Sequence, residues 1–250
     1  MSLEAPSDPE LTRVISSWGE RRLAEGKQVG LHELYTAVAF SLARTVTDLS
    51  LAERAEITEL AQPYFWPGYE RVRPARPNER VEIHEYDPEW VPLFHQIRDA
   101  LKEKLTLTNY AIEQIGSTSI PGLCAKPTVD VMLCVENSHD EQGYLEAASF
   151  AGFELVTRDD QHRFFTTPAS EPRYAQLHVC DLGSQFAVEH LLFRDYLIAH
   201  PQTRDAYAEL KRAAATEWGD DRIAYTYAKN SFILETIEKA HLWNRLGGDL

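Results

Sequence analysis

Residues 115–132 read IGSTSIPGLCAKPTVDVM, a hydroxyl-rich glycine turn that leads into a run of β-branched residues. Gly116 lets backbone amides approach a phosphate, and positions 117–119 offer three consecutive hydroxyl donors. Lys126, one of seven lysines in the chain, supplies a positive charge in the same loop. This composition predicts an anion cradle, and the alternative is a tight structural turn that holds no ligand.

The segment that follows the turn, Thr128–Val135, is predicted to be a strand. Because side chains alternate along a strand, Asp130, Met132 and Cys134 share one face, and the valines occupy the other. A carboxylate on so apolar a strand needs a partner, which is a metal ion, a phosphate-bridging cation or Lys126. In the alternative without a ligand, Asp130 caps the turn through backbone amides.

Other elements are expected on both sides of this segment. Residues 81–86 alternate like a strand, and Asp87 is expected to cap a helix that carries Trp90, Phe94, Ile97 and Leu101 on one face. The remaining strands are expected at 111–115, 154–157, 163–166 and 175–180, and the remaining helices at 140–150, 185–199, 203–218 and 224–243. Strands in the middle with helices before and after predict an α+β fold, with a mixed sheet and helices packed mainly on one face.

Residues 1–78 are predicted to form a small all-α helical module that ends in a proline-rich linker at 66–78. The first helix is expected to begin at Asp8 as N-cap, with Pro9 in the first turn, and to end near Gly26. A second apolar stripe runs from Leu31 to Leu49, and Ser50 with Glu53 fits a capping box for a third helix. The rest of the chain, 79–250, is predicted to be one domain.

The 250-residue chain has a formal net charge of −14, with 39 acidic and 25 basic side chains. This balance argues against a nucleic acid polymer or an anionic membrane as partner, so any phosphate must be met locally. No stretch approaches the roughly 20 apolar residues of a membrane helix, and a cytoplasmic location is expected. The three cysteines show no CxxC spacing, which argues against a disulfide framework or a zinc site.

The segment from Gly116 to Asp130 resembles the signature of the GrpB-like (UPF0157-type) family, which belongs to the nucleotidyltransferase-fold superfamily. The further matches, in the expected order, are Tyr86-Asp-Pro-Glu-Trp90, Leu177-His-Val179, His190 through Leu197 with His200-Pro201, and Tyr225 through Lys229. The resemblance spans about residues 81 to 243. It implies a nucleotidyltransferase-like mixed β-sheet, and residues 1–78 lie outside it.

Enzymes of that superfamily hold a triphosphate on a Gly-Ser pair and bind two Mg²⁺ ions through three acids. Gly116 and Ser117 match the pair, and Asp130 matches the first acid. Met132 and His178 stand at the other two acid positions, and a thioether is a poor ligand for Mg²⁺. The resemblance therefore implies at most a single Mg²⁺ ion, at Asp130, together with a nucleoside triphosphate.

The candidate catalytic residues are Asp130, His178 and Lys126, and the candidate phosphate-binding residues are Gly116, Ser117, Thr118, Ser119, Arg163, Arg194 and Lys229. Each has a structural alternative, which is a surface ion pair for the arginines, a solvated lysine for Lys229 and a hydrogen-bonded core histidine for His178. Arg194 and Asp195, adjacent on a helix, are not expected to face each other.

The predicted function is the binding of a nucleotide or another phosphorylated small molecule and the transfer of an activated group to a small acceptor. His178 is the expected base. The alternatives are a non-catalytic ligand-binding or accessory module without the two-metal site and an ATP-using carboxylate ligase. The family's fusion to dephospho-coenzyme A kinase favours the accessory role, although this chain has no Walker motif of its own.

Overall fold

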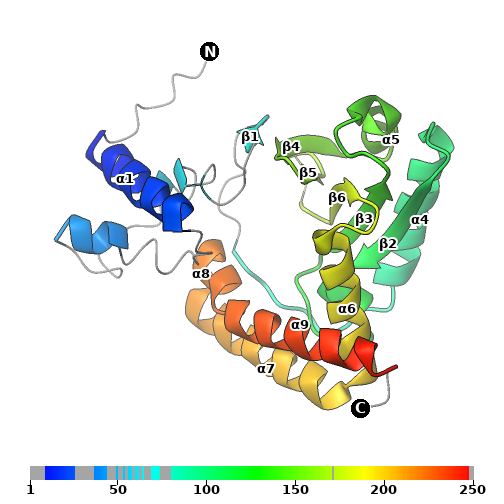
Figure 1. The fold of residues 1–250 in the computed structure, drawn as a ribbon. Helices are drawn as coiled ribbons and strands as arrows, with labels where there is room; N and C mark the ends of the chain where they lie inside the picture. Colours follow the sequence, from blue (N-terminus) through cyan, green and yellow to red (C-terminus); the bar gives the residue numbers. More distant parts are fainter. Residues whose placement is uncertain are drawn as a thin grey trace. The chain divides into compact units, whose positions relative to one another are not determined.

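The computed structural model describes residues 9–25, 37–43, 69–73, 80–170 and 172–247, together with single positions 49, 53, 56, 57, 60, 61 and 64. The chain divides into two compact units, Met1–Glu70 and Arg71–Leu250, which we treat separately. Figure 1 shows the elements of both units along the chain.

The N-terminal unit begins with helix α1 (Pro9–Glu25). Proline has no amide hydrogen, but amides in the first turn have no acceptor within the helix, so no hydrogen bond is lost. Its fixed φ also suits a helix start. Leu11, Ile15 and Trp18 of this helix are buried, and the helix confirms the start that was predicted from Pro9. At 3.6 residues per turn these three positions share one face.

Other predictions for the N-terminal unit are only partly tested. Val38 and Leu49, from the second predicted stripe, are both buried. The predicted cap Asp8, the predicted stop Gly26 and the capping-box residue Ser50 lie outside the described residues. Within the predicted linker, the described part contains the short strand β1 (Glu70–Arg71), so this stretch is not irregular throughout.

The second unit is built on a six-stranded mixed sheet with strand order β1-β4-β5-β6-β3-β2. Its strands after β1 are β2 (Tyr110–Ile115), β3 (Val129–Val135), β4 (Glu154–Arg158), β5 (His162–Thr166) and β6 (Ala175–Asp181). β3 and β6 are parallel, whereas β2 with β3, β4 with β5 and β5 with β6 are antiparallel. Each of these five strands was predicted to within two residues, and the α+β class is confirmed.

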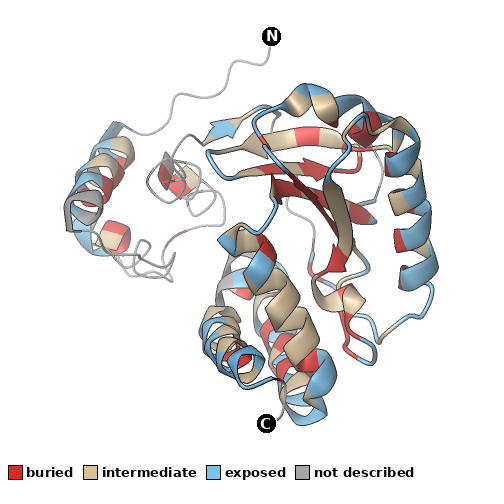
Figure 2. Cartoon of the chain, turned by 45° about the vertical axis from the view of Figure 1, so that its right-hand side comes forward, coloured by how far each residue is buried: buried red, intermediate tan, exposed pale blue. Residues whose placement is uncertain are grey.

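The two faces of β3 pack against different helices, as its alternating pattern predicts. Its four valine and leucine side chains at odd positions join the large apolar cluster under α4 (Trp90–Lys104) and α5 (Leu145–Phe150). Met132 and Cys134 join a second cluster with Cys180 and α6 (Gln185–Ala199) on the opposite face. Helices therefore cover both faces of the sheet rather than mainly one. Figure 2 shows the buried residues concentrated along the central strands between them.

The four residues predicted to form the core face of α4, Trp90, Phe94, Ile97 and Leu101, are all buried. Its start differs slightly from the prediction, because Asp87 Oδ1 accepts from the amide of Glu89 at 2.9 Å and the helix begins at Trp90. This contact is an Asx turn just ahead of the helix rather than a cap on its first residue.

Two further predictions are wrong in detail. Residues 81–86 form no strand, and their ladder contact is a single bridge between His84 and Ala125, with bonds of 2.8 and 2.9 Å. The helix predicted over 224–243 is two helices, α8 (Arg222–Tyr227) and α9 (Asn230–Arg245), separated at Lys229. The helix predicted near 140–150 is present as the 3₁₀ turn η3 (Glu141–Gly143) followed by the short helix α5.

The C-terminal helices support the glycine turn from behind. Ile120, Leu123 and Cys124 of the turn region pack with Leu197 of α6 and Tyr207 of α7 (Pro201–Trp218). All five side chains are at most 3% exposed, and burial of an aliphatic side chain contributes roughly 1.5–3 kcal/mol. The turn is therefore held by an apolar cluster of its own and not only by the sheet.

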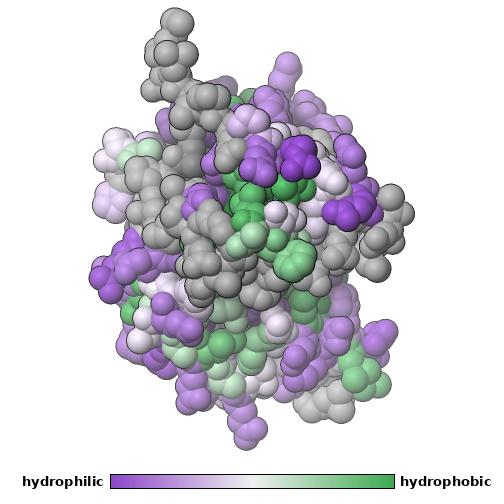
Figure 3. All heavy atoms as spheres, turned by 90° about the vertical axis from the view of Figure 1, so that its left-hand side faces the viewer, coloured by the Kyte–Doolittle hydropathy of each residue, from purple (hydrophilic) through white to green (hydrophobic). Residues whose placement is uncertain are grey.

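The surface of the described part is mixed in character. Hydrophilic side chains outline the face drawn in Figure 3, and hydrophobic residues lie in small groups between them. Among the described helices, none combines the length and the apolar composition needed to cross a membrane.

Candidate functional site

The glycine turn lies where β2 ends, beside the first residues of β3. Gly116 has φ of +69° and ψ of −171°, a conformation that is essentially restricted to glycine. Residues 117–119 form the short 3₁₀ turn η2, and Ser119 closes it by donating from Oγ and from its amide to Gly116 O, at 2.6 and 3.2 Å. Because β2 and β3 pair with Ile115 opposite Asp130, the carboxylate of Asp130 lies against the glycine.

A cavity of about 370 Å³ opens at this turn, between the sheet and the C-terminal helices. Its lining residues are Ile115, Gly116, Ser117, Thr118, Ala125, Lys126, Thr128, Asp130, Gln176, His178, His190, Lys211, Arg222, Tyr225, Thr226 and Lys229. This set includes four cationic side chains and one carboxylate. A chain with a net charge of −14 therefore concentrates positive charge at one cavity.

The three lysines of the cavity repel one another in a desolvated setting. Burial, together with the neighbouring charges of Arg222 and Lys229, lowers the pKa of Lys126 to about 7. Burial likewise lowers the pKa of Lys211 to about 7 and that of Lys229 to about 8. Asp130 opposes the shift in all three. A bound anion would strengthen this opposing effect and restore the positive charge of the amines.

Aromatic rings position two of these amines. Lys229 Nζ lies 4.1 Å from the ring centroid of Tyr225, and Lys126 Nζ lies 5.8 Å from the same ring. The most deeply buried lysine, Lys211, is 2% exposed; its ammonium donates to the carbonyl of Cys124 and lies 5.4 Å from the ring of Tyr207. These contacts hold the amines without neutralising them.

Two hydroxyls of the turn also lie at the cavity. Thr118 is 1% exposed, and its Oγ1 has no hydrogen-bond partner within the described part of the chain. The Ser117 hydroxyl is hydrogen-bonded to Tyr207. A buried hydroxyl without a partner is unfavourable for stability, so the Thr118 hydroxyl is a candidate donor for a ligand.

Asp130 is the start of a chain of polar contacts that runs away from the cavity. Its Oδ1 lies 3.9 Å from His178 Nε2, and His178 Nδ1 lies 3.0 Å from His162 Nε2. In the amide orientation that satisfies both neighbours, Gln176 donates to Asp130 Oδ1 and accepts from Arg173, each at 2.9 Å. Asp130 thus contacts an imidazole on one side and an amide on the other.

The pKa values of both further histidines of this region, His162 and His190, are lowered. Burial lowers the pKa of His162 to about 2, with the neighbouring His178 contributing. Burial is also the main cause that lowers the pKa of His190, which stacks on Phe186 at 4.0 Å between ring centroids. A neutral His162 supplies one ring donor and one acceptor, so its bond to His178 restricts the tautomer of that residue.

The donor set does not build a resident two-metal site. Met132 is fully buried in the apolar cluster and lies opposite His178 in the β3–β6 register. Within the described residues, no three His, Cys, Asp or Glu side chains are grouped so that they could hold a metal ion. Asp130 is the one carboxylate among the described residues of the lining, and four cationic side chains share the cavity with it.

The region that holds this cavity is also the region that other proteins share. A family model described as GrpB protein matches residues 80–239, more than half of the chain. This chain belongs to the GrpB family. The family resemblance stated from the sequence is therefore confirmed, and we call residues 80–239 the GrpB domain.

Relatives of the GrpB domain occur in several bacteria. The chain is 38% identical over 170 residues to a UPF0157 protein from Halalkalibacterium halodurans, covering 66% of this chain and 84% of that protein. It is 36% identical over 160 residues to a UPF0157 protein from Streptomyces coelicolor, covering 64% and 84%. The crystal structure of conserved protein GrpB from Enterococcus faecalis matches with a TM-score of 0.57 and 29% identity, covering 64% and 96%.

The GrpB domain brings most of the predicted site residues to one cavity, with three exceptions. Ser119 does not line it and uses its hydroxyl within the turn. Arg163 is 4% exposed and lies in a network with Glu141, His139 and the carbonyl of Asp159. Since Arg163 lies opposite Val179 in the β5–β6 register, it belongs to the sheet face away from His178.

Arg194 is also absent from the cavity lining. It binds Glu113 at 2.9 Å, and it contacts Asp195 at 2.7 Å, contrary to the expectation that these neighbours do not face each other. Adjacent residues leave a helix in different directions, but the long Arg194 side chain bends so that its Nε reaches Asp195 Oδ1. It donates as well to the carbonyl of Gln114, so it braces the end of β2 near the turn.

Several residues of the cavity were not predicted. Lys211 and Arg222 come from α7 and α8, more than 90 positions after the turn in the sequence. Lys211 carried only a weak signal, its helix spacing from Tyr207 and Ala208, because lysines are seldom fully buried. His162 shares the strand face of His178 only once β5 and β6 are paired.

Proposed function

We propose that the GrpB domain binds a phosphorylated small molecule, with a nucleotide as the leading class, in the cavity at the glycine turn. The observation that carries this proposal is the charge of the lining, which combines Lys126, Lys211, Lys229 and Arg222 with a single carboxylate, Asp130. Phosphate is the common metabolic anion with enough charge to match four cations. Arginine forks and lysine amines are its usual partners in proteins.

The residues divide the work of binding. The backbone at Gly116 and the hydroxyls of Ser117 and Thr118 face a phosphoryl group from the sheet side, and the amine of Lys229 and the guanidinium of Arg222 face it from the helices. The cavity of about 370 Å³ admits a small molecule rather than a polymer. The chain's net charge of −14 further disfavours a polynucleotide.

The nucleotidyltransferase-like arrangement remains part of the proposal. It is supported by a Gly-Ser pair that ends one strand and by Asp130 at the start of the strand paired with it. Mg²⁺ belongs to the proposal only as an ion that arrives with the ligand, since Asp130 is the one carboxylate at the cavity. The three free, buried cysteines agree with the expected cytoplasmic location.

Transfer of an activated group is the second candidate, and the Asp130–His178–His162 chain favours it. An acceptor hydroxyl would give its proton to His178, its oxygen would bond to the phosphorus of the bound nucleotide, and pyrophosphate would leave with the electron pair of the broken P–O bond. Asp130 would stabilise the imidazolium that forms. A non-catalytic ligand-binding module and a carboxylate ligase are the competing possibilities.

Calorimetric titration with ATP, ADP and AMP, with and without Mg²⁺, tests the binding proposal. We expect binding that Lys229→Met weakens about tenfold or more, because a charge-assisted contact to phosphate is lost. Lys239→Met, which changes a lysine outside the cavity lining, is the matched control. If none of these nucleotides and no simple phosphate binds, the proposal is wrong.

Two further measurements separate the candidates. Asp130→Asn should abolish any strengthening of nucleotide binding by Mg²⁺, and an unchanged Mg²⁺ effect removes the metal from the proposal. Pyrophosphate release from a nucleoside triphosphate in the presence of hydroxyl, amine or carboxylate acceptors indicates an enzyme, and the acceptor separates the transferase from the ligase. Tight binding without release, for every acceptor tried, indicates the binding module.

A further inference from the structure

A second cavity, of about 260 Å³, adjoins the one at the glycine turn. Its lining residues are Arg80, Val81, Glu82, Lys126, Pro127, Thr128, Pro172, Arg173 and Arg222. Lys126, Thr128 and Arg222 line both cavities, so the two are contiguous and the shared side chains lie at their junction.

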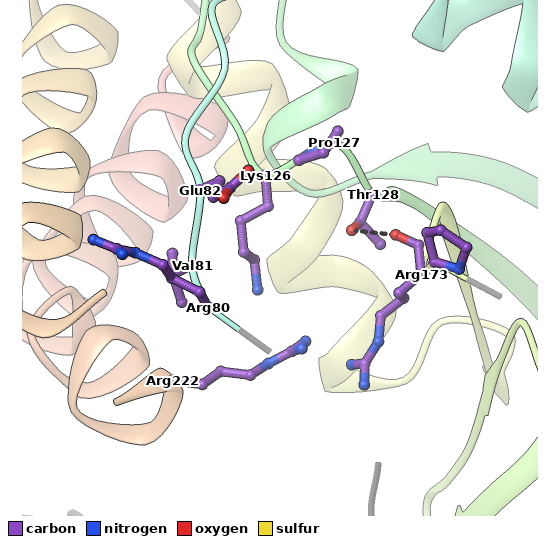
Figure 4. Close-up of a pocket in the computed structure, with 9 residues that line it drawn as sticks. Arg80, Val81, Glu82, Lys126, Pro127, Thr128, Arg173 and Arg222 are labelled. Atoms are coloured by element: carbon purple, nitrogen blue, oxygen red, sulfur yellow. Dashed lines mark hydrogen bonds between the residues drawn. The ribbon is translucent and has the colours of Figure 1, made fainter. Parts of the chain in front are cut away.

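Three cationic side chains point into the second cavity. Figure 4 shows Lys126, Arg173 and Arg222 converging on a common space from three different segments of the chain. Their electrostatic coupling agrees with the picture, because the charges of Arg222 and Arg173 both lower the pKa of Lys126. Like charges gathered around one hollow favour an anion within it.

The position of Arg173 is fixed on both sides of its side chain. Thr128 Oγ1 donates to the Arg173 carbonyl at 3.1 Å and ties its backbone to the start of β3. One guanidinium nitrogen donates to Gln176, which in turn contacts Asp130 in the first cavity. Arg173 is therefore linked to the glycine-turn site although it does not line that cavity.

The other charged residues of the second cavity do not change this balance. Arg80 points away from the hollow in Figure 4, and it lies 3.6 Å from Asp220. Glu82 is the single acidic residue of the lining; its side chain is 70% exposed and lies 4.0 Å from His84. Among the described lining residues, the charged side chains that Figure 4 shows turned into the hollow are those of Lys126, Arg173 and Arg222.

We propose that the two cavities form one bipartite site for a ligand with linked phosphoryl groups, in which one group lies at the glycine turn and a further group reaches Arg173. Lys126 and Arg222 lie between the two positions and contact the connecting phosphoryl group. This proposal rests on the proposed function and narrows its ligand to an oligophosphate chain. Linking two anions raises affinity, because the second contact forms without a further loss of translational freedom.

The test compares inorganic orthophosphate with tripolyphosphate by calorimetry on the full chain, at constant pH and ionic strength. We expect tripolyphosphate to bind at least about tenfold more tightly, since it gains a charge-assisted contact at the second cavity. Arg173→Gln should weaken tripolyphosphate binding about tenfold and leave orthophosphate binding within about twofold. Arg80→Gln makes the same change at the rim and should affect neither.

Arg173→Lys guards against a folding defect, because it keeps the positive charge on a slightly shorter side chain. It should retain more tripolyphosphate affinity than Arg173→Gln while melting like the unmodified protein. Equal affinity for the two phosphates, or an equal loss for both in Arg173→Gln, refutes the bipartite site and leaves the proposed function standing. Failure of every phosphate to bind refutes the proposed function as well.

Discussion

Replacement of Gly116 by alanine tests how the glycine turn and Asp130 fit together. The residue has a φ of +69° and a ψ near 180°, where any side chain is strained. A Cβ at this position would lie 2.3 Å from Asp130 Oδ2, and an ordinary contact requires 3.4 Å or more. The carboxylate would have to move by about 1 Å, the difference between these two distances, which disturbs its hydrogen bond to Gln176.

The expected cost follows from these two effects. Backbone strain of this kind costs roughly 1–3 kcal/mol, and a weakened charge-assisted hydrogen bond costs roughly another 1–2 kcal/mol. We therefore expect Gly116→Ala to lower the free energy of unfolding by about 3 kcal/mol. Gly183 is the matched control, since it has the same φ of +69° and a Cβ there would meet no atom within 4 Å; at that position we expect about 1 kcal/mol.

Hydrogen–deuterium exchange of the amides of β3, read by mass spectrometry, measures the cost within the GrpB domain and avoids assuming a single unfolding transition for both units. A loss of about 3 kcal/mol accelerates the exchange of the slowest amides by about 160-fold, against about fivefold for Gly183→Ala. In the Gly116→Ala background, Asp130→Ala should restore about 1 kcal/mol or more of the lost free energy of unfolding, because it removes the carboxylate that the new Cβ would meet. Equal costs for the two glycines, or additive effects of the Gly116 and Asp130 substitutions, refute this account of the turn.

Three further predictions concern the cavity. Because the pKa values of Lys126, Lys211 and Lys229 are lowered to about 7, 7 and 8, the protein should take up protons when orthophosphate binds near pH 8, and binding should weaken as pH rises through this range. Calorimetry in two buffers of different ionisation enthalpy counts the protons, and proton release would contradict the prediction. Thr118→Val should leave stability within about 1 kcal/mol, as it removes a buried hydroxyl without a described partner, yet weaken orthophosphate binding several-fold. If the protein is a transferase, His162→Gln should shift the pH profile of kcat and leave KM nearly unchanged, because it alters the hydrogen bond that orients His178. An unchanged pH profile of kcat would assign His162 a packing role.

The sheet and its packing were predictable because their signals are local. The alternation along β3 assigns its two faces from seven consecutive residues, and burial against α4 on one face and α6 on the other agrees with it. The break between α8 and α9 was not predictable in the same way. The segment Tyr227–Asn230 contains neither glycine nor proline, and residues of that kind are compatible with a continuous helix.

The site residues likewise fall into two groups, those that lie close together in the sequence and those that only folding brings together. The turn, Lys126 and Asp130 lie within 15 residues of one another, so composition alone brings them together. Arg163 shows the opposite case. It was predicted as a phosphate-binding residue from its residue type, but the β5–β6 register places it on the sheet face away from His178. Lys211 and Arg222 required the helices to fold back over the turn, which no spacing in the sequence encodes.

This division has a consequence for how the cavity behaves without a ligand. One wall comes from the sheet and carries the carboxylate Asp130. Lys211 of α7, Arg222 of α8 and Lys229, just before α9, repel Lys126 across the cavity. The helices are held against the turn by the apolar cluster around Tyr207, which opposes this repulsion. A bound phosphate would attract the cations on both sides of the cavity and relieve the repulsion between them, so the lowered lysine pKa values and the affinity for an anion express the same free energy. The basic cavity of this acidic chain is thus stabilised from outside by packing, and a bound anion would stabilise it from inside.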